Sequence, residues 1–307
     1  MPNLDEKLQT VLDLMGDGKR VSQIKLTDHQ STSHAMSAAL SGLGAKANTD
    51  RDLIRTIHHF ACTGGTLFSK CIASMPNTMV LNEVNPFYRS MPKRAGVGFT
   101  PTDLISLVHQ SGEDLDTEVI RTVFMTGLAA IQKENWRTGR SLVIRDHTHS
   151  QYLTKKSQSG HETTLGILKT RFRVLSLVTV RDPIDSFLSL KRNGWSTHFQ
   201  PSTFDEYCAR YLKFLSDYQD VPTIRYEDFI SHPKRTMREI CAILKLDYND
   251  KFQNLFSSFR FSGDSGRISS EISKRPRLEV SEEFLQTVSA SDKYIELANL
   301  NGYTVHR

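Results

Sequence analysis

The sequence predicts an α/β fold with three layers, in which helices on both faces cover a central, mostly parallel sheet. Short apolar segments of the kind that form buried strands alternate along the chain with segments whose apolar residues recur at helical spacing. Strands that alternate with helices in this way form parallel sheets covered on both faces. The longest apolar runs are far too short to cross a bilayer.

The expected strands are residues 53–60 (LIRTIHHF), 78–82 (TMVLN), 141–146 (SLVIRD), 173–180 (RVLSLVTV) and 222–227 (PTIRYE). The expected helices are residues 66–75, 114–138, 183–193, 203–218, 232–245 and 281–299. Ligands of open parallel sheets bind at the carboxyl ends of the strands, so the residues that follow each strand are the candidates for function.

Ahead of the first strand, Leu4, Leu8, Val11, Leu12 and Met15 recur at helical spacing. We therefore divide the chain into a helical N-terminal extension, residues 1–50, and one main domain, residues 51–307.

The composition narrows the classes of protein. The 307-residue chain has a net charge of +5 and no run of five lysines or arginines, which suits an anionic ligand and argues against nucleic acid. Its four cysteines form no CxxC pair, so reduced thiols in a cytoplasmic protein are expected. The first residues lack the apolar core of a signal peptide. Oligomeric state cannot be inferred.

The first strand is followed by a glycine-rich turn, ACTGGTL at residues 61–67. Glycines allow the backbone to approach an anion closely, and a helix starting near Thr66 would offer unpaired N–H groups. The alternative is a tight turn with a capping threonine. The GxxxxGK[ST] motif of nucleotide-binding loops is absent, and Lys70, one turn further on, is expected to be a solvent-exposed surface residue.

The next two strand ends carry titratable residues. Glu83 follows the second strand, where it is either a base beside the anion or a solvated loop residue. Strand alternation sends Arg145, His147 and His149 to one side of the third strand, where a histidine can accept a proton and an arginine can bind an anion. A metal site is the weaker interpretation, because only Asp146, His58 or His59 offers a third ligand nearby.

The fourth strand ends at Arg181. Asp182 can cap the next helix and Pro183 suits its first turn, while Ser186 and Ser189 rise on one face of that helix. An arginine at a strand end with a serine two turns up the helix would form a compact pocket for a second phosphate.

Together these segments resemble the sulfotransferases that use 3′-phosphoadenosine 5′-phosphosulfate (PAPS). TGGTL (63–67) resembles the family's 5′-phosphosulfate loop, and RYED (225–228) resembles its later YED strand. The resemblance covers roughly residues 54–277 and implies a fold like that of the P-loop NTPases, with PAPS as co-substrate and no metal. The implied donor-binding residues are Thr63, Gly64, Gly65, Thr66, Leu67, Arg181, Ser189 and, in the GDSGR segment, Arg267.

The resemblance implies a transfer to a hydroxyl or amine of a small molecule, saccharide or peptide, but two branches of the family suggest different bases. Glu83 matches the glutamate of tyrosylprotein sulfotransferases, and His147, in RDH, matches the histidine of the cytosolic enzymes' KTH motif, with Arg145 in the place of the lysine. Both remain candidates. Residues 86–112 and 148–165 should line the entrance for the acceptor.

One departure is the absence of the family's loop lysine or arginine, whose position is taken by Cys62. Arg145 is the first candidate to replace this cation, and Lys70 the second. The sequence leaves two alternatives open: a small-molecule kinase, for which Asp146 would hold magnesium, and a nucleotide-binding relative without activity, for which Cys62 is the best indication.

Overall fold

The computed structural model describes residues 50–88, 101–155, 162–262, 271–274 and 276–306. All but the last residue of the predicted N-terminal extension lies outside this range, and so do Arg267 and residues 89–100 and 156–161 of the predicted acceptor-side segments. None of the helices within the described ranges is long and apolar enough to span a membrane.

A five-stranded sheet forms the centre of the molecule, as predicted. All its strand pairs are parallel, and the order across the sheet is β2-β3-β1-β4-β5. The strands are β1 (Leu53–His59), β2 (Thr78–Val84), β3 (Ser141–Asp146), β4 (Arg173–Val180) and β5 (Thr223–Arg225). The predicted bounds of β3 and β4 coincide with the observed ones.

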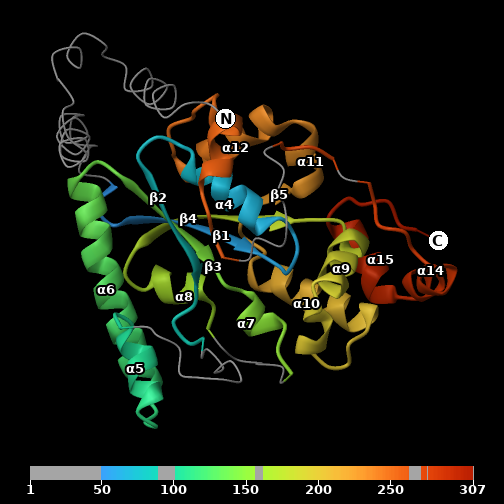
Figure 1. Ribbon diagram of the computed structural model, residues 1–307, viewed down its shortest axis with the longest axis horizontal. Helices are drawn as coiled ribbons and strands as arrows, with labels where there is room; N and C mark the ends of the chain where they lie inside the picture. Colours follow the sequence, from blue (N-terminus) through green and yellow to red (C-terminus); the bar gives the residue numbers. More distant parts are fainter. Residues whose placement is uncertain (1–49, 89–100, 156–161, 263–270, 275, 307) are drawn as a thin grey trace.

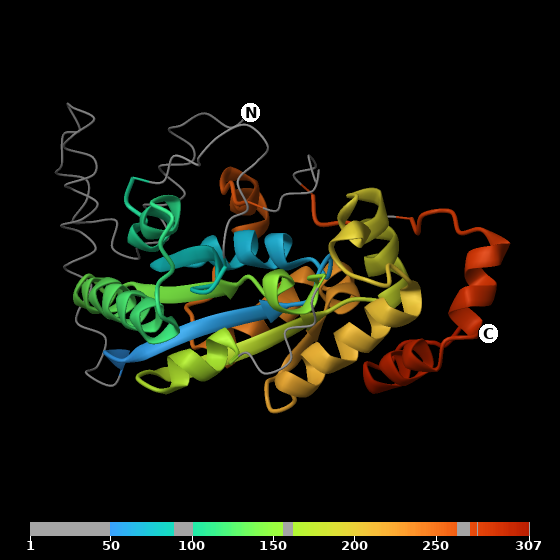
Figure 2. The ribbon, with the colours of Figure 1, turned by 90° about the horizontal axis from the view of Figure 1, so that it is seen from below.

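Helices cover both faces of this sheet. Figure 2 shows α4 on one side and α8 and α10 on the other, while α14 and α15 lie at the end of the molecule away from α6 (Figures 1 and 2). The helices are α4 (Gly65–Ala73), α5 (Leu104–Gln110), α6 (Thr117–Arg137), α7 (His149–Tyr152), α8 (Thr164–Lys169), α9 (Pro183–Arg192), η2 (Trp195–His198), α10 (Phe204–Asp217), α11 (Tyr226–Ser231), α12 (Pro233–Leu244), α13 (Phe252–Leu255), η3 (Phe256–Ser258), α14 (Glu282–Ser289) and α15 (Asp292–Leu300).

Side chains of each strand alternate between two separate cores. On β1, Ile57 packs into the core beneath α4, α11 and α12, whereas Ile54 packs into the core with α6 and α8. On β4, Leu177 joins the first core and Val178 joins the core of α9, α10 and α15. The same alternation decides which polar residues at the strand ends can share a site.

Two predicted elements differ from the observed ones. Residues 226 and 227 were expected to belong to the last strand, but β5 ends at Arg225 and α11 begins at Tyr226. The expected helix 281–299 is divided, because Ser291 is the N-cap of α15 and its hydroxyl accepts a hydrogen bond from the Tyr294 N–H.

Candidate active site

A cleft of about 1470 Å³ opens at the carboxyl ends of the strands. It brings together residues from four of the strand ends that the sequence singled out. Of the predicted site residues within the described ranges, those lining it are Gly64, Gly65, Thr66, Leu67, Glu83, Arg145, His147, Arg181 and Ser189. Thr63 does not line the cleft, because its buried hydroxyl donates to the Phe60 carbonyl at 2.8 Å beneath the loop.

The loop between β1 and α4 makes a sharp turn into the helix. Cys62 and Gly64 have φ angles of 62° and 91°, and Gly64 is the N-cap of α4 without a side-chain cap. The N–H groups of Leu67 and Phe68 donate to the Gly64 carbonyl. The first turn of α4 therefore faces the cleft with the positive end of its dipole, which favours an anion there.

Both loop glycines are required by close contacts with rings. A Cβ atom on Gly64 would lie 2.4 Å from Tyr226 Cδ2, and a Cβ atom on Gly65 would lie 2.4 Å from His59 Cδ2. Such separations are far below normal van der Waals contact, so a side chain at either position would displace a ring or the loop.

Arg181 connects the end of β4 to this loop. Its Nη1 donates to the Cys62 carbonyl at 3.1 Å, and its guanidinium lies 4.8 Å above the centre of the Tyr226 ring. The backbone N–H of Arg181 donates to the hydroxyl of Tyr211. The arginine is thereby held between the loop and α11, facing the cleft.

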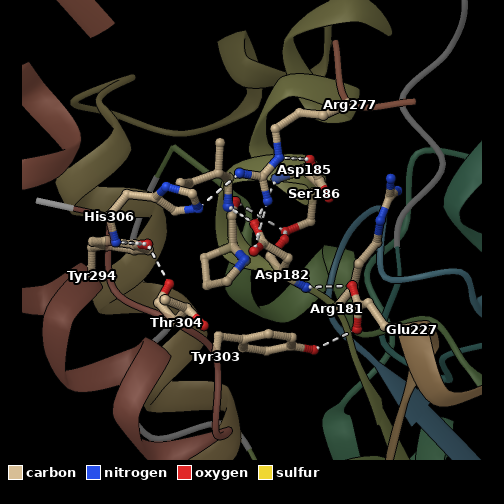
Figure 3. Close-up of polar contacts among 12 residues, drawn as sticks. Arg181, Asp182, Asp185, Ser186, Glu227, Arg277, Tyr294, Tyr303, Thr304 and His306 are labelled. Atoms are coloured by element: carbon tan, nitrogen blue, oxygen red, sulfur yellow. Dashed lines mark hydrogen bonds and ion pairs between the residues drawn. The ribbon is translucent and has the colours of Figure 1, made fainter. Parts of the chain in front are cut away.

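The first turn of α9 is fixed by the C-terminal part of the chain (Figure 3). Arg277 binds Asp182 Oδ2 at 2.9 Å and Asp185 Oδ1 at 2.7 Å, and its Nη1 donates to His306. These carboxylates raise the pKa of Arg277 although burial opposes them. Arg277 lines the cleft as well, so a cation from the C-terminal segment reaches the α9 side of the site.

Glu227, from α11, also holds the backbone at the start of α9. Its Oε1 accepts a hydrogen bond from the Asp182 N–H at 3.0 Å. Its Oε2 accepts from the hydroxyl of Tyr303 at 2.9 Å (Figure 3). Burial raises the pKa of Glu227, while these hydrogen bonds lower it.

Cys62 occupies the position where a loop cation was expected. Ser189 and Asn193, both near the C-terminal end of α9, hydrogen-bond its thiol, the latter at 3.8 Å from Nδ2 to Sγ. Burial raises the pKa of this thiol. Cys62 therefore stays uncharged at neutral pH and joins the loop to α9.

Glu83 is aimed into the site by an irregularity of β2. The register with β3 shifts between Leu81 and Val84, and Glu83 has a φ of 56°, which is unusual for a residue with a side chain. Its Oε1 lies 3.4 Å from Arg145 Nη2, and its Oε2 accepts from the Ser262 hydroxyl at 2.6 Å. Both carboxylate oxygens are thus engaged.

Three histidines form a row along the wall of the cleft. The rings of His59, His149 and His147 contact in succession, with centroids 5.4 and 5.3 Å apart and near-perpendicular planes. Burial is the largest cause that lowers the pKa of all three, and the positive charge of Arg145 lowers each further. We therefore expect all three rings to be neutral at neutral pH.

Asp146 and His58 face away from the cleft, as strand alternation requires. Asp146 Oδ2 accepts from the hydroxyl of Tyr218 and contacts His58 Nδ1, while Oδ1 accepts from the hydroxyl of Thr164. Asp146 is therefore not placed to hold magnesium beside a bound nucleotide. The residues that the structure describes contain no group of three acidic, histidine or cysteine side chains that could bind a metal.

Lys70 is buried and lines the cleft, so the expectation of a solvated surface residue was wrong. Sequence reasoning also missed Arg277 and the contact of His59 with Arg145. The position of His59 beside the glycine loop was a possible signal for it. No signal in the sequence pointed to Arg277, because it lies far along the chain from the elements that it contacts.

A model of the sulfotransferase family matches residues 60–250, which is more than half of the chain. The chain belongs to the sulfotransferase family. This sulfotransferase is therefore a transferase, and its family implies PAPS as the donor.

Solved structures resemble its fold at low sequence identity. The sulfotransferase domain of the Synechococcus PCC 7002 olefin synthase has a TM-score of 0.50 and 16% identity, over 85% of this chain and 98% of its own. The sulfotransferase domain from the curacin biosynthetic pathway gives 0.49 and 14%, over 82% and 98%. Mouse sulfotransferase SULT7A1, solved with PAP, gives 0.37 and 12%, over 86% and 93%. A comparison with curated sequences gives no significant match.

Proposed function

We propose that this sulfotransferase moves a sulfuryl group from PAPS to a hydroxyl or amine of an acceptor, by in-line displacement in the cleft at the strand ends. The observation that carries the proposal is that the glycine loop, Arg181 and Arg145 line one cleft, with Arg181 hydrogen-bonded to the loop itself. Two anion-binding places, side by side, suit a nucleotide that carries phosphate at both its 3′ and 5′ positions.

The two places take different parts of the donor. Residues 64–67 hold the 5′-phosphosulfate at the first turn of α4, with the Thr66 hydroxyl as a further donor. Arg181 and Ser189 hold the 3′-phosphate, and Arg277 is near enough along α9 to contribute. Arg267, the third 3′-phosphate ligand that the resemblance implies, lies outside the described residues.

Arg145 takes the role of the missing loop cation. It is 3% exposed at the end of β3 and lines the cleft beside the glycine loop. When the bond between sulfur and the bridging oxygen breaks, its electron pair moves to that oxygen, where the guanidinium stabilises the negative charge. Removing one such preorganised donor typically costs about 3 to 4 kcal/mol of activation free energy.

His147 is the base that this arrangement favours. It is neutral, because burial lowers its pKa, whereas both oxygens of Glu83 already bind Arg145 and Ser262. As the acceptor oxygen or nitrogen forms its bond to sulfur, His147 takes the proton that the acceptor loses. Glu83 then serves to orient Arg145.

The assignment of Arg181 is tested by calorimetric binding of adenosine 3′,5′-bisphosphate and of adenosine 5′-monophosphate. Arg181→Ala should weaken the bisphosphate about 10- to 100-fold, as expected for a charged hydrogen bond, and leave the monophosphate nearly unchanged. The control is Lys191→Ala, which removes the same charge from an exposed position on α9, the helix that follows Arg181, outside the lining of the cleft.

Equal weakening of both nucleotides by Arg181→Ala would contradict this assignment. Transfer of labelled sulfate from PAPS to a panel of hydroxyl and amine acceptors tests the activity itself. Binding of the bisphosphate without any consumption of donor would instead identify a nucleotide-binding protein without activity.

A further inference from the structure

His59, the last residue of β1, is in direct contact with Arg145. Arg145 Nη2 and Nε lie 3.0 and 3.2 Å from His59 Nε2. A guanidinium has only donors, so Nε2 must accept and cannot carry a proton. The imidazole therefore has its single proton on Nδ1.

The surroundings of His59 keep the ring in that neutral form. The residue is 1% exposed, and burial lowers its pKa well below the ordinary value. The neighbouring charge of Arg145 and the rings of His149 and His147 act in the same direction. A proton on Nε2 would also face the two N–H donors of Arg145.

The same ring supports the glycine loop. The close approach of Gly65 to His59 Cδ2, Cγ and Nε2 places the imidazole directly against the start of α4. His59 thus lies between the loop proposed to hold the phosphosulfate and the arginine proposed to stabilise the leaving oxygen. A shift of this ring would change the separation of the two.

Arg145 has further restraints from the neighbouring strand. Its Nη1 donates to Asn82 Oδ1 at 2.9 Å, and Glu83 lies 3.4 Å from Nη2. Of these partners on β1 and β2, His59 alone is both uncharged and in contact with the loop. It orients the guanidinium without neutralising it.

We propose that His59 is a positioning residue for sulfuryl transfer, which holds the guanidinium of Arg145 against the glycine loop through its unprotonated Nε2. This proposal rests on the proposed function, because it concerns the same site and the same step. His59 itself does not touch the reacting atoms. Its removal should therefore lower the rate of transfer more than the affinity for nucleotide.

Two variants separate the hydrogen bond from the packing of the ring. His59→Leu keeps an apolar side chain beneath Gly65 but removes the acceptor, whereas His59→Gln keeps an acceptor oxygen near the position of Nε2. Formation of adenosine 3′,5′-bisphosphate from PAPS in single turnover, with an acceptor from the panel present to receive the sulfuryl group, reports the rate of transfer.

His59→Leu should lower that rate about 10- to 100-fold, as expected for the loss of a hydrogen bond to a charged group. His59→Gln should retain the rate within about 5-fold, and both variants should bind the bisphosphate nearly as the parent does. If both substitutions lower the rate equally, or if affinity falls as far as rate, the proposal is wrong.

A double-mutant cycle that combines His59→Leu with Arg145→Ala provides the second test. If His59 acts through Arg145, His59→Leu should change the rate by less than about 2-fold once Arg145 has been removed. If the double variant shows the product of the two single rate reductions, His59 acts on something other than Arg145.

Nitrogen-15 spectra of histidine-labelled protein give a readout that does not depend on activity or on folding of a variant. His59 should show an unprotonated Nε2 and a protonated Nδ1, unchanged from about pH 5.5 to pH 8. A ring protonated on Nε2, or one that titrates with an ordinary pKa, would overturn the proposal. If the spectra agree but PAPS is never consumed, the proposed function fails and the contact itself stands.

Discussion

The two ends of the cleft hold their arginines in different ways. At the loop end, Arg145 is 3% exposed and contacts the neutral ring of His59 and one carboxylate, Glu83 at 3.4 Å. At the α9 end, the Arg277 side chain is 34% exposed and binds two carboxylates, Asp182 at 2.9 Å and Asp185 at 2.7 Å. Arg277 is thus bound by two short ion pairs near the surface, whereas Arg145 lies in a buried site, where it contacts Glu83 at the longer distance of 3.4 Å.

This difference indicates that the two ends of the cleft contribute to different properties of the enzyme. A buried cation interacts strongly with additional negative charge, because little water screens it, and this suits the charge that develops during reaction. A cation already in ion pairs near the surface suits charge that is present before reaction. Contacts made only in the transition state raise the rate, and those made in the ground state set affinity. We therefore expect substitutions at the loop end to affect kcat, and those at the α9 end to affect binding.

The largest effect is expected at the base. His147→Asn should slow single-turnover donor consumption about 100- to 10,000-fold, because the proton of the acceptor is no longer removed. The affinity for adenosine 3′,5′-bisphosphate should not change. Glu83→Gln is the matched comparison, and should have the smaller effect. If Glu83→Gln abolishes the rate while His147→Asn leaves it intact, Glu83 is the base.

The parent enzyme's pH profile sharpens this assignment. Burial lowers the pKa of His147 from its ordinary value of 6.5. The base is therefore already unprotonated at neutral pH, so the rate should be constant above pH 6.5 and decline only in more acidic solution. A decline centred above pH 6.5 would point to another group.

Arg145→Ala should give the next largest effect, a fall of about 100- to 1,000-fold in rate. Nucleotide affinity should stay within about 3-fold, because the leaving oxygen gains its charge only during reaction. Arg145→Lys keeps a charge but not the fork that contacts His59 and Asn82 together, and should recover part of the rate. Affinity that falls in parallel with rate would remove the contrast between the two ends.

A smaller effect is expected from Arg277→Ala at the opposite end. Calorimetry should show about 10-fold weaker binding of adenosine 3′,5′-bisphosphate and unchanged binding of adenosine 5′-monophosphate. The rate with saturating donor should remain within about 2-fold. A large fall in that rate with unchanged affinity would place Arg277 in the same class as Arg145.

The smallest effect concerns stability in acid. The pKa values of His59 and His149 are lowered in the folded state, chiefly by burial. Below about pH 6.5 the unfolded chain therefore binds protons that the folded chain does not, so stability is retained above that pH and lost below it, by up to about 1.4 kcal/mol per pH unit for each histidine. Urea unfolding at pH 7.5 and pH 5.5 measures the loss. His149→Phe should reduce the loss, and an unchanged one would show that His149 titrates normally.

Much of the sheet could be predicted, because buried parallel strands are short apolar runs bounded by turns. β3 and β4 were predicted to the residue. The carboxyl ends of those strands led directly to Arg145 and Arg181, since parallel strands deliver such residues to one edge. Alternation along the third strand also predicted that Asp146 lies on the opposite side from Arg145 and His147.

The remainder depends on contacts between distant parts of the chain. The bulge that aims Glu83 leaves no mark in the sequence of β2, and Lys70 is buried by elements that its own helix does not reveal. Arg277 meets Asp182 across 95 positions, which no local pattern records. The contact of His59 with Arg145 could be recognised only once β1 and β3 were known to be neighbours.

The stacking of Gly64, Tyr226 and Arg181 has a consequence for redesign. The glycine lies against the tyrosine ring, the ring lies under the guanidinium, and the guanidinium returns to the loop through the Cys62 carbonyl. The two places proposed to hold the phosphates of the donor are therefore joined to each other by these contacts. Redesign of the enzyme for a cheaper donor that lacks the 3′-phosphate could not consist of replacing Arg181 alone. The packing of Tyr226 against the loop would have to be redesigned as well.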